Sequence, residues 1–530
     1  MPESNAPLSA PQGPGEAPPA PTLPPNDAPQ WMDDAARNRA KWTILLTAFL
    51  DILGFSIIIP QLPIYAAQFG ASPLMTGLLA SVYSMMGFLF TPVWGRLSDR
   101  YGRRPILLVS ICGTALGYIV FALANSLPML FLARLVDGTT GGNISTAQAY
   151  LSDISPPEER SKNYGLFGAT FGIAFAIGPL LGSLFTHLPG KWGGNFGLGM
   201  FSLALGTLNF LLAARFLPET LSPAIRAANL AKPPAPNPIS GYVKTFSIPR
   251  LNTVVLIGLL ATTAFATIQG IYGLYILKEY TRPQVQREIE RDPRDAVQRA
   301  RALLGAEAKT PAQASGGEDG ALFSPGAGAN DATTPYAKQF GGDYNGPKNG
   351  AAPPEGLSWR HVEKLLVRPE SARIVANIFA VIGLLSLFIQ GGLMRKLPQK
   401  VGEVPLVIAG TFIMALGLLC VNLMDTLAPH QVWGQYLACT VLTLGNGLST
   451  PVLTSLVSQL SPEDARGETL GVFQSTQSLG RILGPNIGGL AFMFLSSGAP
   501  FLFGAGIMVV AALMALQLRG LKTGPKPAPA

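Results

Sequence analysis

Long apolar runs alternate with short polar loops along most of the chain. Twelve runs are long enough to cross the hydrocarbon core of a bilayer, which takes about 20 helical residues for ~30 Å. They cover residues 42–67, 72–93, 104–124, 127–149, 163–187, 194–217, 251–277, 372–394, 404–424, 430–456, 468–492 and 498–518. In lipid each backbone polar group must be paired within its own segment, so we expect helices. The pattern predicts an all-α membrane protein with twelve transmembrane helices.

Basic residues in the loops predict how these helices are oriented. If the N-terminus is cytoplasmic, nearly all loop Lys and Arg fall on the cytoplasmic side, and the short outer loops hold only Lys191. This asymmetry follows the positive-inside rule. We therefore expect a multi-pass protein of a cell membrane, in particular a bacterial inner membrane, with both termini in the cytoplasm.

The segments outside the runs differ in composition. Residues 1–41 are rich in Pro and Ala and predict a disordered cytoplasmic tail, 218–250 predict a cytoplasmic linker, and 519–530 a second cytoplasmic tail. A long segment, 278–371, falls on the outer side as an insert. Its start predicts one or two short amphipathic helices, and its end predicts a surface helix leading into the run at 372–394. Its Gly-, Ala- and Pro-rich middle, 310–356, predicts disorder.

Two sequence blocks repeat at one offset. SPPEERSKNYG at 155–165 returns as SPEDARGETLG at 461–471, and GPLLG at 178–182 returns as GPNIG at 484–488, each 306 residues later. The repeat indicates two pseudo-symmetric six-helix bundles, 42–217 and 251–277 joined with 372–518. Parallel repeats of this kind are a transporter architecture, with the solute site between the halves.

Charge and cysteine content exclude several function classes. Only 13% of the 530 residues are charged, against about 25% in soluble proteins. The net charge of +8 is spread over short loops rather than gathered on one stripe, so we expect no nucleic-acid partner. The three cysteines lie in apolar runs without metal-ligand spacing, and no phosphate-binding loop occurs. We expect no metal, no cofactor and no enzymatic activity.

The loop after the second run carries the first specific motif. It reads GRLSDRYGRRP from Gly95 and resembles the signature G-x-L-x-D-R-x-G-R-R of the major facilitator superfamily. The resemblance implies that family's fold and a gating role, in which Asp and Arg residues lock neighbouring helix ends and glycines permit the turn. A plain positive-inside loop would need only the arginines. The matching positions are Gly95, Asp99, Arg100, Gly102, Arg103 and Arg104, and the second-half counterpart at 392–402 is degenerate.

Glycine and proline motifs lie in the fifth and eleventh runs. Both resemble the superfamily's antiporter motif G-x-x-x-G-P-x-x-G-G. The fifth run departs from this motif at Ala174 and Ser183, and the eleventh run matches it throughout. Small residues let helix backbones approach closely, and proline bends a helix. The motif favours export, and close packing alone is the alternative. Its positions are Gly178, Pro179, Gly182, Gly484, Pro485 and Gly488.

Ionisable residues inside spans are costly and mark functional sites. Asp51 lies nine residues past Trp42, or roughly 14 Å along a helix, where burial disfavours the carboxylate and allows proton exchange. Arg134 and Asp137 are three residues apart, on one helix face. They resemble the family's R-x-x-Q-G motif with Asp in place of Gln, and that Arg is tied to proton movement in proton-coupled members. The alternatives are a hydrogen-bonded neutral Asp51 and a plain Arg134–Asp137 ion pair.

Arg481 is the one in-membrane charge of the second half. It can hold an anionic group of a solute, pair with a carboxylate across the halves, or extend toward the cytoplasmic end of its helix. Polar residues of the neighbouring runs are further candidates for solute binding: Gln269, Gln390, Asn446, Gln474 and Gln477.

Within the superfamily the chain resembles tetracycline-type drug:proton antiporters, through AYLSDISPPEERSKNYG and LSDRYGRRPILL. Those exporters carry an Asp in the third span, where this chain has Gly117, so tetracycline itself is not the expected solute. We expect a monomeric, proton-coupled exporter of small amphiphilic or drug-like solutes that works by alternating access. A symporter or uniporter for a metabolite is the alternative, followed by a non-transporting receptor or scaffold.

Overall fold

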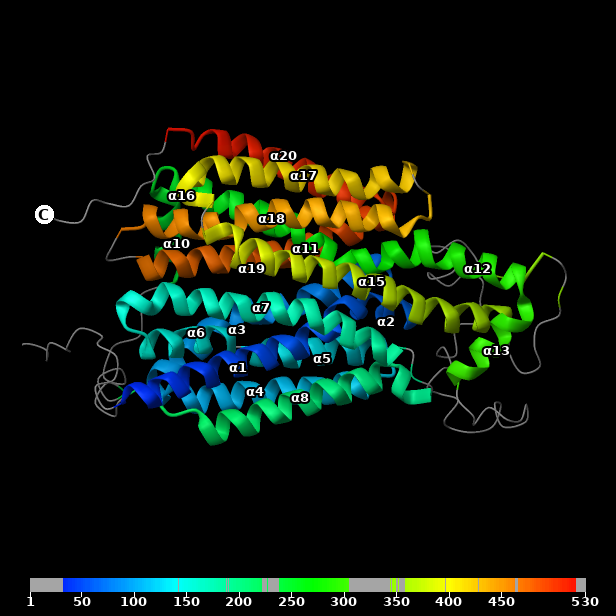
Figure 1. The fold of residues 1–530 in the computed structure, drawn as a ribbon, viewed down its shortest axis with the longest axis horizontal. Coiled ribbons are helices and arrows are strands. Elements are labelled where there is room, and N and C mark those ends of the chain that lie inside the picture. The colour runs from blue at the N-terminus through cyan, green and yellow to red at the C-terminus, as the bar shows by residue number, and fades with distance from the viewer. Residues whose placement is uncertain are drawn as a thin grey trace, which may run out of the picture.

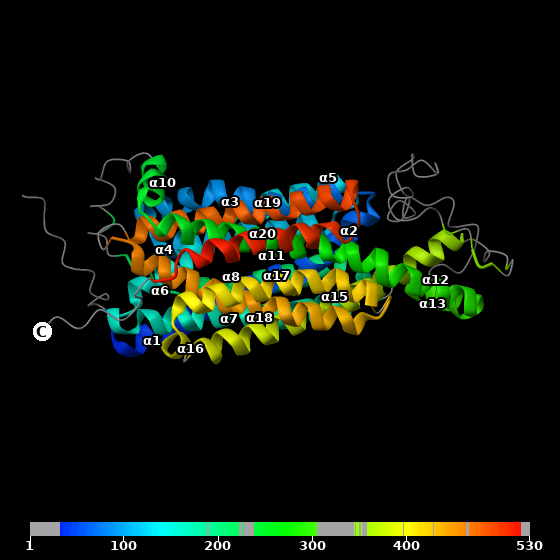
Figure 2. The same ribbon diagram turned by 90° about the horizontal axis from the view of Figure 1, so that it is seen from above.

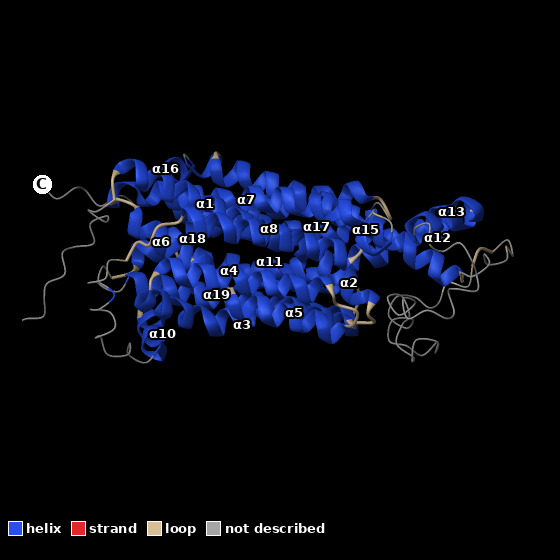
Figure 3. Cartoon of the chain, turned by 90° about the horizontal axis from the view of Figure 1, so that it is seen from below, coloured by secondary structure: helices blue, strands red, loops and turns tan. Residues whose placement is uncertain are grey.

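The computed structural model describes residues 32–520 apart from 142, 187, 189, 222–225, 227–237, 305–343, 345, 349–350, 352–357, 396, 428 and 463–465. All regular secondary structure in these residues is helical (Figure 3). The helices run side by side in two layers, with the first half below the second in Figure 1. We call the end that carries residues 95–104 the motif end, and the opposite end, which carries α12 and α13, the insert end.

The first half contains the helices before residue 217. They are α1 (Asp34–Ile58), η1 (Ile59–Gln61), α2 (Leu62–Gln68), α3 (Pro73–Tyr101), α4 (Arg103–Ala122), α5 (Leu127–Thr140), α6 (Asn143–Ile154), α7 (Pro157–Thr186), η2 (Gly190–Gly193) and α8 (Asn195–Phe216). The first helix begins at Asp34, inside the segment predicted as tail, because Asp33 caps it by accepting a hydrogen bond from the Ala36 amide. The predicted tail before residue 32 lies outside the described residues.

The second half follows a short helix in the linker. Its helices are α10 (Pro238–Ser247), α11 (Leu251–Ile276), η3 (Leu277–Thr281), α12 (Arg282–Arg291), α13 (Pro293–Leu304), α15 (Trp359–Gly391), η5 (Leu393–Arg395), α16 (Leu397–Val401), α17 (Glu403–Leu427), α18 (Val432–Leu460), α19 (Arg466–Phe494) and α20 (Ala499–Leu516). The C-terminal tail beyond residue 520 is outside the described part of the chain.

Within the described parts of the chain, ten helical stretches are long and apolar enough to cross a membrane. The two remaining predicted spans correspond to the α5–α6 pair and to α19. Each of α5 and α6 is too short alone, with 14 and 12 residues, and α19 carries the polar residues of the eleventh run. The two layers of helices agree with the predicted pair of bundles.

The fourth predicted span is interrupted rather than continuous. α5 ends at Thr140, where the hydroxyls of Thr139 and Thr140 bond back to carbonyls one turn earlier. Such bonds compete with the helix ladder, and Gly141 follows them. A new helix then starts at Asn143, so the interruption lies in the middle of the first half.

The insert end continues the seventh and eighth spans beyond the bundle (Figures 1 and 2). α12 and α13 follow α11 through one π turn, and α15 starts thirteen residues before the predicted span. Val285 and Ile289 of α12 are fully buried against this extension, and Arg282 pairs with Glu363 of α15 at 2.8 Å. The start and the end of the insert are therefore packed helices, and most of its middle lies outside the described residues.

The halves meet along two helix pairs, α3 with α19 and α7 with α15. A Cβ built on Gly77 would lie 2.2 Å from the Pro485 carbonyl oxygen, and one on Gly383 would lie 2.4 Å from the Ala176 nitrogen. Nearer the motif end of the same four helices, Cβ atoms on several glycines would meet nothing within 4 Å: Gly87, Gly95, Gly168, Gly391 and Gly471. The tightest glycine contacts between the halves therefore lie from the middle of the bundle to its insert end.

Candidate functional site

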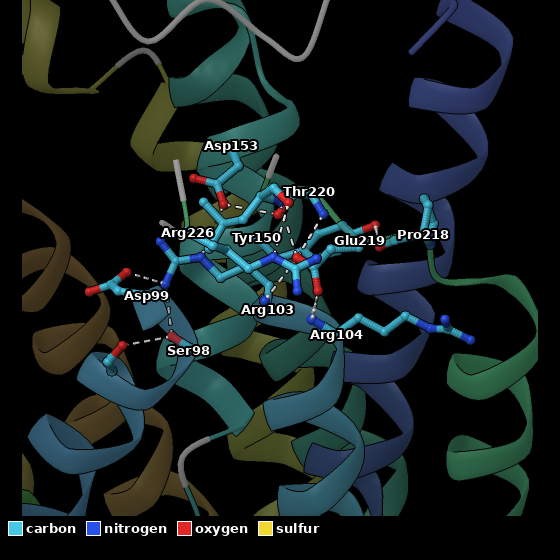
Figure 4. Close-up of polar contacts among 12 residues, drawn as sticks. Ser98, Asp99, Arg103, Arg104, Tyr150, Asp153, Pro218, Glu219, Thr220 and Arg226 are labelled. Carbon is cyan, nitrogen blue, oxygen red and sulfur yellow. Dashed lines mark hydrogen bonds and ion pairs between the residues drawn. The ribbon is translucent and has the colours of Figure 1, made fainter. Parts of the chain in front are cut away.

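Glycine at position 102 lets the motif loop turn between α3 and α4. Its φ of +111° suits only glycine, and a Cβ here would lie 2.4 Å from a carboxylate oxygen of Glu219. That carboxylate accepts hydrogen bonds from the amides of Arg103 and Arg104 at 3.0 and 3.2 Å. A carboxylate is favourable at the positive end of a helix dipole, so Glu219 anchors the chain after α8 to the start of α4 (Figure 4).

The Arg103 side chain connects three helices at the motif end (Figure 4). It forms ion pairs with Asp99 at 2.5 Å and Asp153 at 3.0 Å, and it donates to the Ser98 hydroxyl at 2.8 Å. Asp153 lies beyond the predicted span 127–149. Burial raises the pKa of its carboxyl, and Arg103 opposes that shift. The motif residues Asp99 and Arg103 thus hold α3, α4 and α6 together, whereas Arg100 lies in the last turn of α3.

The degenerate second-half loop at 392–402 makes a similar backbone turn at glycine, but the side chains after the turn carry a different charge. Gly402 also has a positive φ, +90°, and Glu403 follows it where Arg103 follows Gly102. Glu403 accepts hydrogen bonds from Ser455 at 2.6 Å and Gln459 at 2.9 Å. Gln459 lies 306 residues after Asp153, so an amide replaces the carboxylate of the first half. The two clamps at the motif end are related in position but differ in charge.

A buried ion pair lies at the centre of the first half. Arg134 and Asp137 are 0% and 2% exposed, and their charged atoms are 2.9 Å apart. Apart from this ion pair, none of the three guanidinium nitrogens of Arg134 has a hydrogen-bond partner among the described residues. A buried guanidinium normally uses most of its five donors. Arg134 therefore retains the capacity to bind a further acceptor.

Aromatic rings lie on one side of this pair. The Arg134 guanidinium carbon is 6.0 Å from the Phe55 ring and 5.8 Å from the Tyr83 ring, and the two rings are 4.8 Å apart. Asp51, one turn from Phe55 on α1, is half-buried, hydrogen-bonds the Asn143 side chain and lies within electrostatic range of Asp137. The structure thus brings the three predicted proton-coupling residues into one cluster.

Gly117 makes room for Asp137. A Cβ at position 117 would lie 3.0 Å from the Asp137 Cβ. The third predicted span, α4, therefore has a glycine at the point where the Asp137 carboxylate approaches from α5. The carboxylate of this region is carried by α5 instead of α4.

Arg481 faces the first half from the middle of α19. Its guanidinium donates to the Ser478 hydroxyl at 2.7 Å and lies within electrostatic range of Tyr83 on α3. Tyr83 is therefore near both Arg134 of the first half and Arg481 of the second. The three predicted roles of Arg481 stay predictions.

The five polar candidates of the second half are more scattered. Gln269, Asn446 and Gln477 are half-buried, and Gln390 and Gln474 are exposed toward the motif end. The Asn446 amide oxygen accepts a hydrogen bond from Thr450 within its own helix. The structure does not bring all five into contact with Arg481.

The antiporter-like motifs provide close helix contacts. Cβ atoms on Gly178 and Gly182 would overlap Ser56 and the Ile57 carbonyl of α1. In α19, Gly484 packs on the Thr263 carbonyl and Gly488 on Thr267, both in α11. The α7 motif packs within its own half. The α19 motif also reaches across the halves, because Pro485 contacts Gly77.

Several residues of these clusters are not predicted from the sequence. Glu219 and Asp153 complete the motif-end clamp, and Asn143 contacts Asp51. Glu219 lies in the segment predicted as the linker, and the one sequence signal for its role is its position just after the span at 194–217. Asn143 follows a Gly-Gly pair inside a span, which is a signal for an interrupted helix.

Comparisons with known sequences agree with this architecture. A model of the Major Facilitator Superfamily matches residues 44–281 and 334–530. Tetracycline resistance protein, class H, of Pasteurella multocida is 38% identical over 159 residues, 29% of this chain and 40% of that protein. Class C of Escherichia coli is 34% identical over 212 residues, 39% and 50% of the two chains. The matches span about half the length of these relatives or less.

Solved structures share the fold at low identity. The human organic anion transporter MFSD10 has a TM-score of 0.55 and 19% identity, over 90% of this chain and 99% of that chain. A D-xylose-proton symporter has a TM-score of 0.58 and 14% identity, over 90% and 96%. Because the family model covers most of the sequence, this multi-pass membrane protein belongs to the major facilitator superfamily.

Proposed function

We propose that the protein exports small amphiphilic solutes across a cell membrane in exchange for protons. The observation that carries this proposal is the half-buried Asp51 beside the buried Arg134–Asp137 pair. The pair neutralises itself, so Asp51 is the carboxyl of this cluster that has no oppositely charged partner of its own among the described residues. Binding one proton there changes the charge of the centre, which is the property that a proton-coupled carrier needs.

Alternating access would move this centre between the two sides. If the motif end is in the cytoplasm, as the positive-inside rule predicts, the tight contacts of Gly77 and Gly383 would close the outer side. A solute would then enter from the cytoplasm. A proton on Asp51 would change the net charge beside the Arg134–Asp137 pair, and this change would accompany the switch between the two states.

The groups around the centre suit an amphiphile with an anionic group. Phe55 and Tyr83 offer apolar ring faces, while the unpaired donors of Arg134, together with Arg481, suit an anion. Tetracycline resistance proteins and an organic anion transporter occur among the related proteins and structures. The solute class proposed here lies within the range that those names cover.

The decisive experiment uses purified protein in vesicles with an imposed pH gradient. Tetracycline, fluorescein as an anionic amphiphile and ethidium as a cationic one serve as probes, with a pH dye on the opposite side. Uphill flux of a probe with proton flow in the opposite direction is the expected result. Proton flow in the same direction as the probe would instead establish the symporter, for which Arg481 is the candidate anion ligand. No flux of any probe under any gradient would contradict both.

A further inference from the structure

Four buried polar side chains form a group inside the first half, apart from the interface between the halves. Thr47 of α1, Thr114 and Tyr118 of α4 and Asn209 of α8 are 3%, 5%, 2% and 0% exposed. The Thr47 and Tyr118 hydroxyls and both amide atoms of Asn209 have no hydrogen-bond partner among the described residues, whereas Thr114 lies within hydrogen-bonding reach of Asp137. Buried polar groups are almost always paired, with protein or with ordered water. We call these four residues the polar wedge.

The register of α1 and α8 places Thr47 opposite Asn209. The helices are antiparallel neighbours, and the Ser202 hydroxyl reaches the Gly54 carbonyl at 3.5 Å. Thr47 lies seven residues from Gly54 toward the motif end, and Asn209 lies seven residues from Ser202 in the same direction. Seven residues are about two helical turns, so each residue lies on the same face of its helix as the contact. Both side chains therefore lie at one level, roughly 10 Å from that contact.

Tyr118 fills the insert end of the wedge. A Cβ on Gly54 would lie 2.7 Å from the Tyr118 hydroxyl, and one on Gly206 would lie 3.7 Å from its ring. These two glycines, from α1 and α8, leave the space that the tyrosine of α4 occupies. Thr114 lies one turn from Tyr118, on the side of Asp137. The wedge thus extends from the ion pair toward the motif end.

Asp51 lies between the two ends of the wedge. It is one turn from Thr47 and three residues from Gly54, on the same face of α1. One turn beyond Thr47, toward the motif end, Thr43 is only half-buried. Polar groups therefore follow one face of α1 from the surface at Thr43, through Thr47, to the carboxyl of Asp51.

We propose that Thr47 and Asn209 hold ordered water between α1 and α8, and that this water carries protons between Asp51 and the motif end. A buried water needs two to four polar partners, and the wedge offers four unpaired atoms beside a carboxylate. In each transfer a water oxygen accepts one proton and releases another to the next oxygen. One proton moves, and no electron is exchanged.

This route differs from the path of the solute. The solute would occupy the space between the halves, next to Tyr83 and Arg481, and would cover the approach to Asp51 from that side. A proton route inside the first half keeps Asp51 connected while solute is bound. The groups that face Asp51 are Asn143 and Asp137, and the same cluster includes Arg134, Tyr83 and Tyr118. The inference rests on the proposed role of Asp51 in proton coupling.

The test measures hydrogen–deuterium exchange at the Asp51 carboxyl by infrared spectroscopy of the full-length protein in lipid vesicles. The difference spectrum between wild type and Asp51→Asn assigns the protonated carboxyl band, and transfer to D2O shifts it. We expect Asn209→Leu and Thr47→Val to slow that shift at least tenfold. Asn209→Ser, which keeps a polar group and room for water, should stay within threefold of wild type, as should Ser202→Ala on the same face of α8.

The outcomes separate the two proposals. If Asp51→Asn removes no carboxyl band at any pH between 5 and 8, the proton-carrying role of Asp51 fails. If the band is present and shifts at the wild-type rate in both Asn209→Leu and Thr47→Val, the water route is wrong and Asp51 keeps its role. The thermal unfolding midpoint of each variant identifies one that is misfolded. Thr47→Val, which keeps the side-chain shape, decides the question if Asn209→Leu fails to fold.

Discussion

At the scale of single residues, the three charged side chains at the centre of the first half differ in their burial and in their partners. Arg134 and Asp137 are buried and paired, whereas Asp51 is half-buried and bound to a neutral amide. A buried ion pair is costly to break, because the remaining charge is left without a partner. The pair is therefore suited to stay intact while Arg134 offers its remaining donors to a solute, and Asp51 is suited to gain and lose a proton.

Replacing Asp51 by Asn tests this division of roles. We expect Asp51→Asn to abolish uphill transport driven by a pH gradient, because an amide binds no proton at neutral pH. Exchange of labelled for unlabelled probe without a gradient should persist within about tenfold. Asp34→Asn, which alters an exposed carboxylate on the same helix, is the matched control and should transport as wild type does. Uphill transport in Asp51→Asn would remove Asp51 from the mechanism.

The contact between Gly117 and Asp137 predicts that the carboxylate can be moved between helices. Asp137→Gly alone leaves Arg134 buried without its partner, and we expect transport to fall at least a hundredfold. The double variant Gly117→Asp/Asp137→Gly places the carboxylate on α4 and vacates the space it needs. We expect it to recover at least a tenth of wild-type transport, measured in the same vesicles. If the double variant is as inactive as Asp137→Gly, the position of the carboxylate is specific to α5.

At the scale of the element, helix ends and interruptions place the functional side chains. Gly102 and Gly402 both turn the chain at the motif end, and acidic side chains stabilise the helix start that follows each turn. The break between α5 and α6 brings Asn143 to Asp51. These features are local in sequence, but their partners come from other helices.

Removal of the Glu219 carboxylate tests the motif-end clamp. Glu219→Ala leaves the amides of Arg103 and Arg104 without their acceptor, and we expect the free energy of unfolding to fall by about 1–2 kcal/mol. Chemical unfolding of the detergent-solubilised protein measures this change. Glu219→Gln keeps an acceptor oxygen without the charge and should lose about half as much. A Glu219→Ala protein as stable as wild type would show that the carboxylate adds nothing to the helix start.

At the scale of the whole molecule, small residues allow the two halves to close. The backbones of α3 and α19 touch at Gly77, and those of α7 and α15 touch at Gly383. Such contacts form without side-chain rearrangement, so they can form and separate in each transport cycle. The glycines nearer the motif end have room for the opposite closure.

Enlarging Gly77 should favour the state that is open at the insert end. A valine there would overlap the Pro485 carbonyl, so we expect Gly77→Val to separate the halves at that end and bring them together at the motif end. In a protein without Cys112, Cys420 and Cys439, a cysteine placed by Gly471→Cys reports on the motif end. We expect its reaction with a water-soluble maleimide to slow at least fivefold in Gly77→Val. Gly506→Val, at a site with open space in α20, is the control and should leave the rate unchanged.

Much of the architecture could be predicted because hydrocarbon imposes a simple rule on sequence. Long uncharged runs must be helices in lipid, and matching blocks at one offset reveal the repeat. The charge centre was found for the same reason, since Asp51, Arg134 and Asp137 are rare exceptions inside apolar runs. The antiporter-like glycines could also be recognised in the sequence, but the helix that each of them contacts could not be predicted.

Tertiary structure decided which polar groups lie together. Glu219 is 116 residues from Arg103, and Asn209 is 162 residues from Thr47, so no local pattern could connect either pair. Apolar periodicity is strong in a membrane helix because lipid acts on every turn, whereas a contact between two polar side chains depends on the register and rotation of two helices. The sequence by itself therefore determined the spans, the repeat and the in-membrane charges. Only the packing of the helices decided how those charges are paired and which buried atoms are left for water.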